Sequence, residues 1–248
     1  MAKSKRKNNG TKTESQRGDI DSSNKKSTTV KQQPSLLAKF PQLIAKHGLK
    51  VEQVEPNQIY LIPHFFNAKE CESLIQYFDT HLTPQTVSLY PKPGEAFRSN
   101  DRQSMQDPIL ANKIWELGLD KLCAQEEGIN QVSLPRQPCG LNSNLRIYRY
   151  RPGQRFEAHY DDTVKDTATG YWTDWTLLIY LNDTMEGGET VFYKDHGKKK
   201  KKMSDPVVIR PQQGLALLHR HGQHCLLHEA LEVTRGNKWV LRSDVLIG

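Results

Sequence analysis

Apolar and polar positions follow a helical period in the first half of the chain. Between residues 71 and 78, apolar residues recur at i, i+3, i+4 and i+7, which predicts an amphipathic helix with one face on the core. Asn67, followed three positions later by Glu70, has the form of a capping box that starts such a helix. An Asp-Pro pair opens a second predicted helix over residues 107–125. Helical spacing broken by a proline also occurs over residues 35–48.

The period then changes to that of strands. Residues 51–66 already alternate as a strand does, and from Leu141 onward only short strands separated by Gly, Pro, Asn and Asp are predicted. These strands have the sequences LRIYRY, TLLIYLND, ETVFY, PVVIRP, GLALLHR, CLLHEA and NKWVLRSDVLI. Helices followed by many short strands predict an α+β protein whose C-terminal half is a sandwich or a barrel.

A polar connection lies between the two predicted helices. We interpret its segment FRSNDRQSM, residues 97–105, as a lid or a substrate loop in which Arg98, Asn100 and Arg102 offer polar contacts. An exposed loop without such a role is the alternative interpretation.

Charge separates the first residues from the rest of the chain. Residues 1–35 hold nine Lys or Arg and three Asp or Glu, so they account for +6 of the net charge of +7. Because this segment has almost no large apolar residues, it is predicted to be a disordered basic tail. Its KSKRK run is typical of a solvated tail, of a nuclear-import signal or of a nucleic-acid contact. The run Lys198 to Lys202 predicts a solvated loop, with an acidic partner as the alternative.

Two further features concern the compartment. No apolar run is long enough to span a membrane, and the N-terminus lacks the apolar segment of a secretory signal. We therefore expect a location in the nucleus or cytoplasm, without a membrane partner. The four cysteines form no CxxC pair, which favours reduced, mostly packed thiols over a zinc cluster or a disulfide framework.

Candidate chemistry begins at His159 and Asp161, which one residue separates. In an extended backbone both side chains project from the same face, as two ligands of one metal ion would. A third ligand would come from one of the histidines at positions 219, 221, 224 and 228. Two histidines and one carboxylate form the facial triad of non-haem Fe(II) oxygenases, which leaves coordination positions open. By itself, the His-x-Asp pair is equally compatible with a polar pair at a strand end.

Five motifs in order extend this pattern over about residues 140–248. They are YRPGQRFEAHYDD, LLIYLND, GGETVFY, LLHEA and GNKWVLRSDVLI. Together they resemble the prolyl 4-hydroxylase type of 2-oxoglutarate- and Fe(II)-dependent oxygenase. The resemblance implies a double-stranded β-helix, a jelly-roll relative of the cupins, over residues 140–248. Residues 36–139 would form the helical N-terminal part of the catalytic domain and buttress this barrel.

The resemblance also implies site residues. His159, Asp161 and His228 match the three iron ligands of the family. His228 is preferred among the histidines because it precedes Lys238 by ten residues, the family's separation between its distal ligand and the base that binds the distal carboxylate of 2-oxoglutarate. His219, His221 and His224 are then read as non-ligands, although one of them could support a ligand.

Three other residues are candidates for binding the co-substrate. Arg242 is the rival of Lys238; the two share a strand face, but their Cα atoms are about 13 Å apart in an extended strand. Tyr180 matches a family tyrosine whose hydroxyl can bond the same carboxylate, and it is equally compatible with a core position. Tyr150 is a candidate for the pocket lining. No catalytic group beyond the metal centre is predicted.

The implied function is that of a 2-oxoglutarate-dependent dioxygenase with Fe(II), 2-oxoglutarate, O2 and ascorbate. It would hydroxylate a C-H bond and release succinate and CO2. A protein prolyl side chain is the preferred substrate, because the Asn-x5-Arg tail of nucleic-acid demethylases is not evident after the distal histidine. A small-molecule or nucleic-acid oxygenase and a non-catalytic binding module remain the alternatives, since fold and triad do not determine the substrate.

Overall fold

The computed structural model describes residues 40–81, 83, 85–86, 94–124, 137–194 and 205–248. The described residues all belong to one compact unit, Ser35–Gly248. The basic tail itself and the Lys198 to Lys202 run lie outside the described residues.

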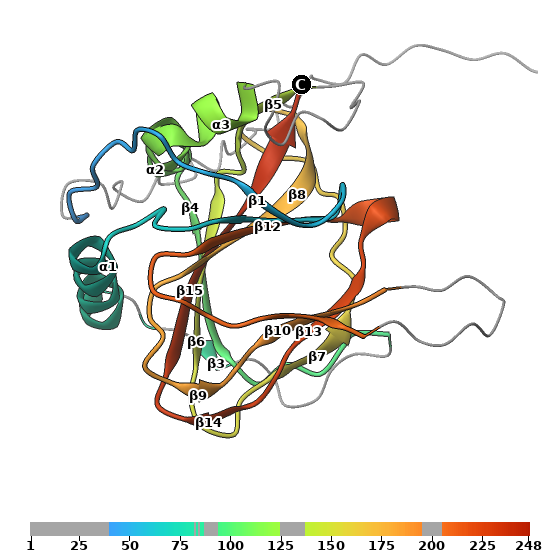
Figure 1. The fold of residues 1–248 in the computed structure, drawn as a ribbon. Helices are drawn as coiled ribbons and strands as arrows, with labels where there is room; N and C mark the ends of the chain where they lie inside the picture. Colours follow the sequence, from blue (N-terminus) through green and yellow to red (C-terminus); the bar gives the residue numbers. More distant parts are fainter. Residues whose placement is uncertain (1–39, 82, 84, 87–93, 125–136, 195–204) are drawn as a thin grey trace, which may run out of the picture. The chain divides into compact units, whose positions relative to one another are not determined.

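Most described strands belong to one antiparallel sheet, the main sheet, in the order β1-β2-β12-β8-β15-β6-β4-β3, with β5 also paired to β15. Its strands are β1 (Glu52–Glu55), β2 (Ile59–Ile62), β3 (Gln85–Thr86), β4 (Asp101–Gln106), β5 (Pro138–Leu141), β6 (Asn144–Tyr150), β8 (Trp172–Tyr180), β12 (Ala216–Arg220) and β15 (Lys238–Ile247). A smaller antiparallel sheet, in the order β11-β10-β13-β7, faces it (Figure 1). The smaller sheet contains β7 (Phe156–His159), β10 (Thr190–Tyr193), β11 (Val207–Ile209) and β13 (Leu227–Ala230), and β9 (Glu186–Gly187) pairs separately with β14 (Val233–Arg235).

Side-chain alternation in the main sheet divides the core in two. In β6, Ile147 packs in the cluster that contains the helices, while the next residue, Tyr148, packs in the cluster between the sheets. Leu241 and Val240 of β15 divide in the same way. Because successive side chains of a strand point to opposite faces, one face of the main sheet carries the helices and the other faces the smaller sheet (Figure 1). The pocket described below lies on that second face.

The two predicted helices are present at their predicted starts. In α1 (Ala68–His81), Asn67 Oδ1 accepts the Glu70 backbone N–H at 2.9 Å, and Glu70 Oε2 accepts the Asn67 N–H at 2.8 Å, which confirms the capping box. Asp107 caps α2 (Pro108–Ile114) by accepting the Leu110 N–H at 3.0 Å.

The second helical segment is interrupted, which the sequence pattern does not show. After α2 it continues as a π-helix (Trp115–Leu119) and then as α3 (Asp120–Ala124). Gly118 has φ 139°, a conformation that breaks the helical path and that L side chains rarely adopt. A side chain there would also approach Leu49 to 2.9 Å, so this glycine allows a close contact between the helix and the chain before β1.

Three predictions about the N-terminal part were wrong. In the described part of the segment 35–48 there is no helix; residues 41–50 are irregular, with a bend at His47 and Gly48, and the Lys46 N–H donates to the Leu117 carbonyl at 2.6 Å. The strand expected over residues 51–66 is the hairpin β1-β2, which turns at Asn57 with φ 59°. The segment interpreted as a lid or loop, residues 97–105, is largely strand β4, which lies between β3 and β6.

The N-terminal part therefore contributes strands to the main sheet as well as helices. None of the helices in the described ranges is long and apolar enough to cross a membrane. All four cysteines are free thiols, and Cys71, Cys123 and Cys225 are buried.

Candidate active site

Two neighbouring strands of the smaller sheet bring the predicted metal ligands together. His159 ends β7, and His228 in β13 lies directly opposite it in the register of the two strands. Their rings are 4.3 Å apart between centroids. Asp161 follows β7 by two residues, so its side chain returns to the same side as His159.

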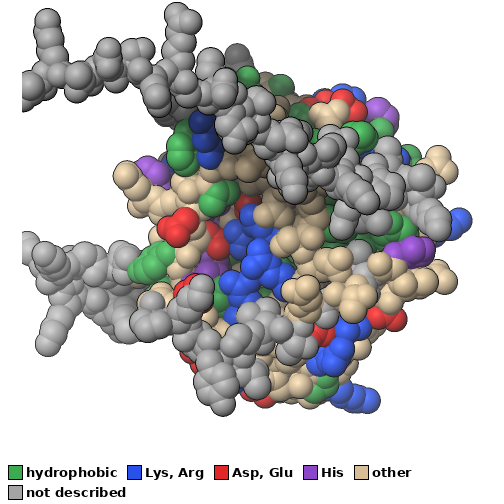
Figure 2. Space-filling model, turned by 180° about the vertical axis from the view of Figure 1, so that it is seen from behind, with side chains coloured by type: hydrophobic (Ala, Val, Ile, Leu, Met, Phe, Trp, Pro, Cys, Tyr) green, Lys and Arg blue, Asp and Glu red, His purple; other side chains and the backbone are tan. Residues whose placement is uncertain are grey.

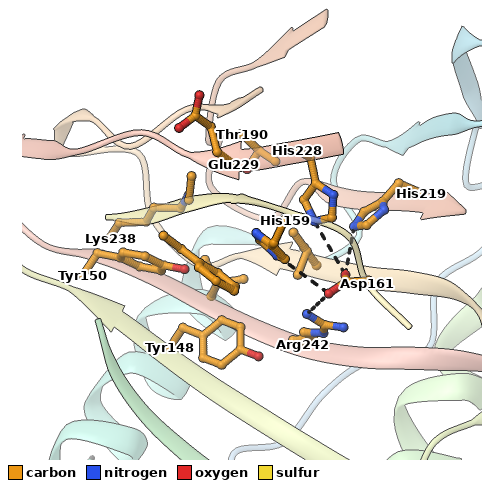
Figure 3. Close-up of a pocket in the computed structure, with 14 residues that line it drawn as sticks. Tyr148, Tyr150, His159, Asp161, Thr190, His219, His228, Glu229, Lys238 and Arg242 are labelled. Carbon is orange, nitrogen blue, oxygen red and sulfur yellow. Dashed lines mark hydrogen bonds and ion pairs between the residues drawn. The ribbon is translucent and has the colours of Figure 1, made fainter. Parts of the chain in front are cut away.

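The three side chains converge at distances that fit one ion (Figure 3). His159 Nε2 is 3.7 Å from Asp161 Oδ1, and His228 Nε2 is 3.6 Å from Asp161 Oδ2. One ligand atom from each of the three residues lies within 4.8 Å of the others. Donor atoms about 2.1 Å from one divalent ion lie roughly 3 to 4 Å from each other. Two imidazoles and one carboxylate, without a thiolate in this set, fit non-haem Fe(II).

Backbone carbonyl groups orient both ligand imidazoles. His159 Nδ1 lies 2.8 Å from the Glu157 carbonyl oxygen, and His228 Nδ1 lies 2.9 Å from that of Leu226. A carbonyl oxygen can only accept a hydrogen bond, so each Nδ1 carries the proton and each Nε2 keeps its lone pair toward Asp161. This is the tautomer that binds a metal through Nε2.

Electrostatics keep the donors in their metal-binding protonation states. Burial lowers the pKa of His159 to about 3, with a further contribution from His228, and burial also lowers the pKa of His228. Burial alone would raise the pKa of Asp161, but the Arg242 guanidinium and the neighbouring histidines outweigh it and hold this pKa well below its usual range. At neutral pH the site therefore presents neutral imidazoles and an ionised carboxylate.

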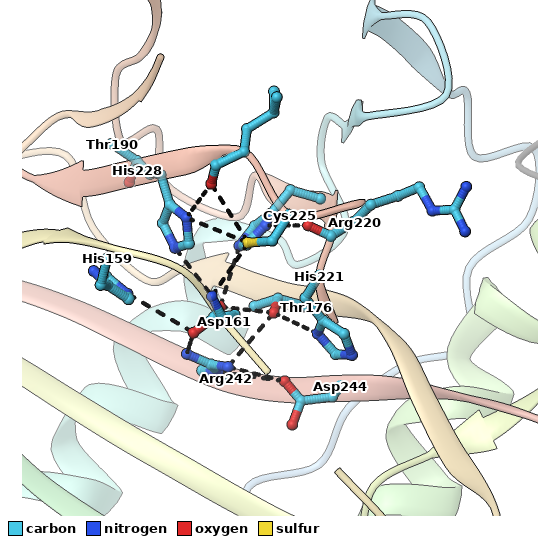
Figure 4. A network of polar contacts seen from close by, with 12 residues as sticks. His159, Asp161, Thr176, Thr190, Arg220, His221, Cys225, His228, Arg242 and Asp244 are labelled. Carbon is cyan, nitrogen blue, oxygen red and sulfur yellow. Dashed lines mark hydrogen bonds and ion pairs between the residues drawn. The ribbon is translucent and has the colours of Figure 1, made fainter. Parts of the chain in front are cut away.

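Asp161 is held by groups from several elements (Figure 4). Thr176 Oγ1 donates to Asp161 Oδ2 at 2.9 Å, and Arg242 Nη1 donates to Asp161 Oδ1 at 3.1 Å. The Asp161 N–H also donates to Cys225 Sγ at 3.2 Å. Arg242 is itself paired with Asp244 at 3.2 Å. Its guanidinium is thus directed at the proposed iron ligand.

Lys238 also lines the pocket, and its ammonium group is held apart from carboxylates. Its side chain is 2% exposed, and Nζ donates to the Gly188 carbonyl at 2.6 Å while lying 5.1 Å from the Tyr150 ring centroid. Burial lowers the pKa of Lys238 to about 7, and the charge of Glu189 opposes this only in part. Among the described residues, no carboxylate forms an ion pair with Lys238. A buried cation of this kind favours an anionic ligand.

One pocket joins the triad and Lys238 (Figure 3). It is lined by Tyr148, Tyr150, Phe156, His159, Asp161, Leu178, Thr190, His219, His228, Glu229, Ala230, Lys238, Val240 and Arg242. Lys238, Val240 and Arg242 line it together because they alternate along one face of β15. The pocket therefore includes Lys238, Arg242 and Tyr150 from the predicted co-substrate residues.

Tyr180, the remaining predicted residue, lies behind the pocket. It is fully buried, and its hydroxyl shares a 2.7 Å hydrogen bond with Thr190 Oγ1. Thr190 does line the pocket, so Tyr180 orients a lining residue and does not reach the cavity itself. Sequence reasoning missed Thr190 and Tyr148; the alternation of ETVFY and LRIYRY determines their sheet faces, but it does not show which face meets the pocket.

The histidines read as non-ligands differ from one another. His224 is exposed, and His221 is buried with its Nδ1 3.0 Å from Thr176 Oγ1. His219 is 1% exposed, and its Nε2 is 3.7 Å from Asp161 Oδ2, the same distance range as for the two predicted imidazole ligands.

Cationic side chains surround the site. Arg98 lies over the Phe156 ring at 4.2 Å, and Phe156 in turn stacks on His159 with a centroid distance of 3.6 Å. Burial lowers the pKa of Arg102, and the nearby Arg98 and Arg242 lower it further. Figure 2 shows a face on which Lys and Arg side chains gather in a central hollow, with a histidine beside them. Such surroundings favour anionic ligands.

Comparison with known proteins agrees with this chemistry. Residues 145–243 match the model of the 2OG-Fe(II) oxygenase superfamily. Two Arabidopsis thaliana proteins are similar: "Probable prolyl 4-hydroxylase 9" is 28% identical over 199 residues, covering 75% of this chain and 67% of that protein. "Probable prolyl 4-hydroxylase 3" is 29% identical over 201 residues, covering 73% and 66%. This chain thus spans about two thirds of the length of these relatives.

A solved structure is similar in fold. It is a Trichoplax adhaerens prolyl hydroxylase in complex with a hypoxia inducible factor oxygen degradation domain peptide fragment, with a TM-score of 0.54 and 16% identity. The match covers 78% of this chain and 86% of that one. The predicted double-stranded β-helix fold is thereby confirmed.

Proposed function

We propose that the chain is a member of the 2OG-Fe(II) oxygenase superfamily, of the prolyl 4-hydroxylase type, and that it hydroxylates a prolyl side chain of a protein. As a 2-oxoglutarate-dependent dioxygenase it uses Fe(II), 2-oxoglutarate and O2, and ascorbate is typical of prolyl hydroxylases. We propose His159, Asp161 and His228 as the iron ligands.

One observation carries the proposal. The pocket that holds the three convergent donors also contains Lys238, a buried cation without a carboxylate partner among the described residues. 2-Oxoglutarate chelates a metal through its keto acid end and leaves a second carboxylate to be neutralised. A pocket with a metal site and a separate buried ammonium group has this complementarity.

Each residue then has a defined task. The iron, when bound, supplies the redox chemistry that couples decarboxylation of 2-oxoglutarate to hydroxylation of a C-H bond. Lys238 would bind the distal carboxylate, with Thr190 and Tyr150 beside it. Arg242 and Thr176 hold the Asp161 carboxylate in place. The apolar lining excludes water from the pocket.

A protein substrate is supported by the relatives. The similar Arabidopsis proteins carry prolyl 4-hydroxylase names, and the Trichoplax enzyme is seen with a peptide. A contact between nucleic acid and the basic tail, and a location in the nucleus or cytoplasm, stay predictions that no comparison tests.

The experiment is a turnover assay with the full chain. The protein is incubated with Fe(II), 2-oxoglutarate, ascorbate and a library of proline-containing peptides, and we expect succinate together with a +16 Da product. If no peptide is oxidised but another added compound is, the proposal of a prolyl substrate is refuted. Absence of any succinate would refute the enzyme.

Two histidine variants provide the matched control. His228→Ala removes a proposed ligand and should abolish both iron binding and turnover, whereas His224→Ala removes an exposed imidazole and should preserve both. Retention of iron by the first variant and its loss in the second would overturn the assignment of the third ligand.

A further inference from the structure

His219 lies beside the proposed metal site, where His219, Cys225 and His228 also bring one possible ligand atom each within 4.8 Å of one another. One nitrogen of His219 has no hydrogen-bond partner among the described residues. His219 belongs to β12, on the same strand face as Leu217, which packs between the two sheets. Its Nε2 is fully buried and has no hydrogen-bond partner among the described residues. A buried polar atom that is left unpaired is unfavourable, so its presence calls for a ligand.

The ring of His219 is oriented like those of the two proposed ligand histidines. Its Nδ1 lies 3.2 Å from a backbone carbonyl oxygen, that of Arg220, just as His159 and His228 place Nδ1 against carbonyl groups. Because a carbonyl oxygen can only accept a hydrogen bond, Nδ1 of His219 carries the proton and Nε2 keeps its lone pair. That Nε2 points at Asp161 Oδ2 from 3.7 Å (Figure 3).

Packing holds His219 in this orientation. Its ring makes an edge contact with Phe192 at 5.1 Å and lies 4.6 Å from the ring of His228. Asp161 is thus surrounded by three imidazoles, each presenting Nε2 at 3.6 to 3.7 Å. A facial triad accounts for only two of them.

We propose that His219 is a fourth protein ligand of the metal in the enzyme free of co-substrate, and that 2-oxoglutarate replaces it on binding. The replacement follows from the number of coordination positions. A triad leaves three positions open, and the co-substrate chelate and dioxygen together require all three. A fourth protein ligand that stayed bound would leave too few open coordination positions for both 2-oxoglutarate and dioxygen. The inference rests on the metal centre of the proposed function and not on its substrate.

The test measures metal binding without turnover. Co(II) is titrated into wild type and into His219→Phe, with and without saturating 2-oxoglutarate, and both affinity and visible absorption are recorded. Without 2-oxoglutarate, the variant should bind Co(II) about tenfold or more weakly, with a changed spectrum that reports the lost donor. With 2-oxoglutarate, the affinities and spectra should converge. By linkage, the Co(II)-loaded variant should bind 2-oxoglutarate more tightly by the same factor.

Controls separate this role from a packing defect. The metal-free His219→Phe protein should be at least as stable as wild type, because the substitution removes an unpaired buried atom at similar volume; His219→Leu serves if the phenylalanine variant does not fold. His221→Phe removes an equally buried imidazole that contacts Thr176. Any change that it causes in Co(II) affinity should be the same with and without 2-oxoglutarate.

Two results would overturn the proposal. Equal Co(II) affinity and equal spectra of wild type and His219→Phe would exclude His219 as a ligand. A loss of affinity that is equally large with and without 2-oxoglutarate would exclude the replacement. Neither result depends on whether a prolyl peptide is hydroxylated, so failure of the substrate assignment remains distinguishable.

Discussion

The buried ammonium group of Lys238 should make the binding of 2-oxoglutarate depend on pH. In the free enzyme its pKa is lowered to about 7 by burial. Pairing with a carboxylate favours the charged form and therefore raises this pKa in the complex. Binding then requires a protonated Lys238. The affinity for 2-oxoglutarate should be highest below pH 7 and should fall as the pH rises above 7. The fall should end near the pKa of Lys238 in the complex.

The pKa sets the size of this effect. About half of the free enzyme is protonated at Lys238 at pH 7, about one tenth at pH 8 and about one hundredth at pH 9. Apparent affinity scales with the fraction in the competent state. The dissociation constant for 2-oxoglutarate should therefore rise about fiftyfold from pH 7 to pH 9. At pH 8, binding should take up close to one proton per site.

Isothermal titration calorimetry of the anaerobic Mn(II)-loaded protein measures the dissociation constant for 2-oxoglutarate at each pH. Repeating the titration in buffers of different ionisation enthalpy gives the number of protons taken up. Lys238→Met keeps the length of the side chain but removes the charge. It should bind 2-oxoglutarate weakly at every pH and lose the dependence of affinity on pH that Lys238 causes. Any pH dependence that comes from the metal ligands should remain. An affinity of the wild type that is flat from pH 7 to pH 9, or an equal slope in Lys238→Met, would refute the reasoning.

Three further predictions concern the support of the site and the fold. Arg242→Leu removes the ion pair of Asp161 and should weaken Mn(II) binding by about 10- to 100-fold, with a smaller effect on 2-oxoglutarate binding than the lysine variant, as shown by metal and co-substrate titration. Glu70→Ala breaks the capping box and the ion pair with Lys46, and should lower the free energy of unfolding in urea by about 1 to 3 kcal/mol; unchanged stability would contradict this. Gly214→Ala would place a Cβ 1.9 Å from the Phe66 carbonyl oxygen at φ +79°, so its thermal melting should show a loss of about 2 kcal/mol or more.

Local signals in the sequence were sufficient for the starts of the two predicted helices and for the C-terminal strands. The capping box of Asn67 and Glu70 acts over three residues, and the alternation of each C-terminal strand is visible within the strand itself. Strand β4 was missed for a different reason. Its first residue, Asp101, is buried because Arg149 and Arg151 neutralise it at 3.0 and 3.1 Å. Since these partners lie about fifty residues away in the chain, the polar segment reads locally as a loop.

The sequence by itself determined that His159 and Asp161 share one face, because the two-residue period of an extended chain requires it. It also ordered the motifs that indicate the family. Only the tertiary structure decided which further histidines reach the same carboxylate: strand pairing places His228 opposite His159, and the packing of the two sheets brings His219 to Asp161. Those contacts join residues more than fifty positions apart, and no local period encodes such distances.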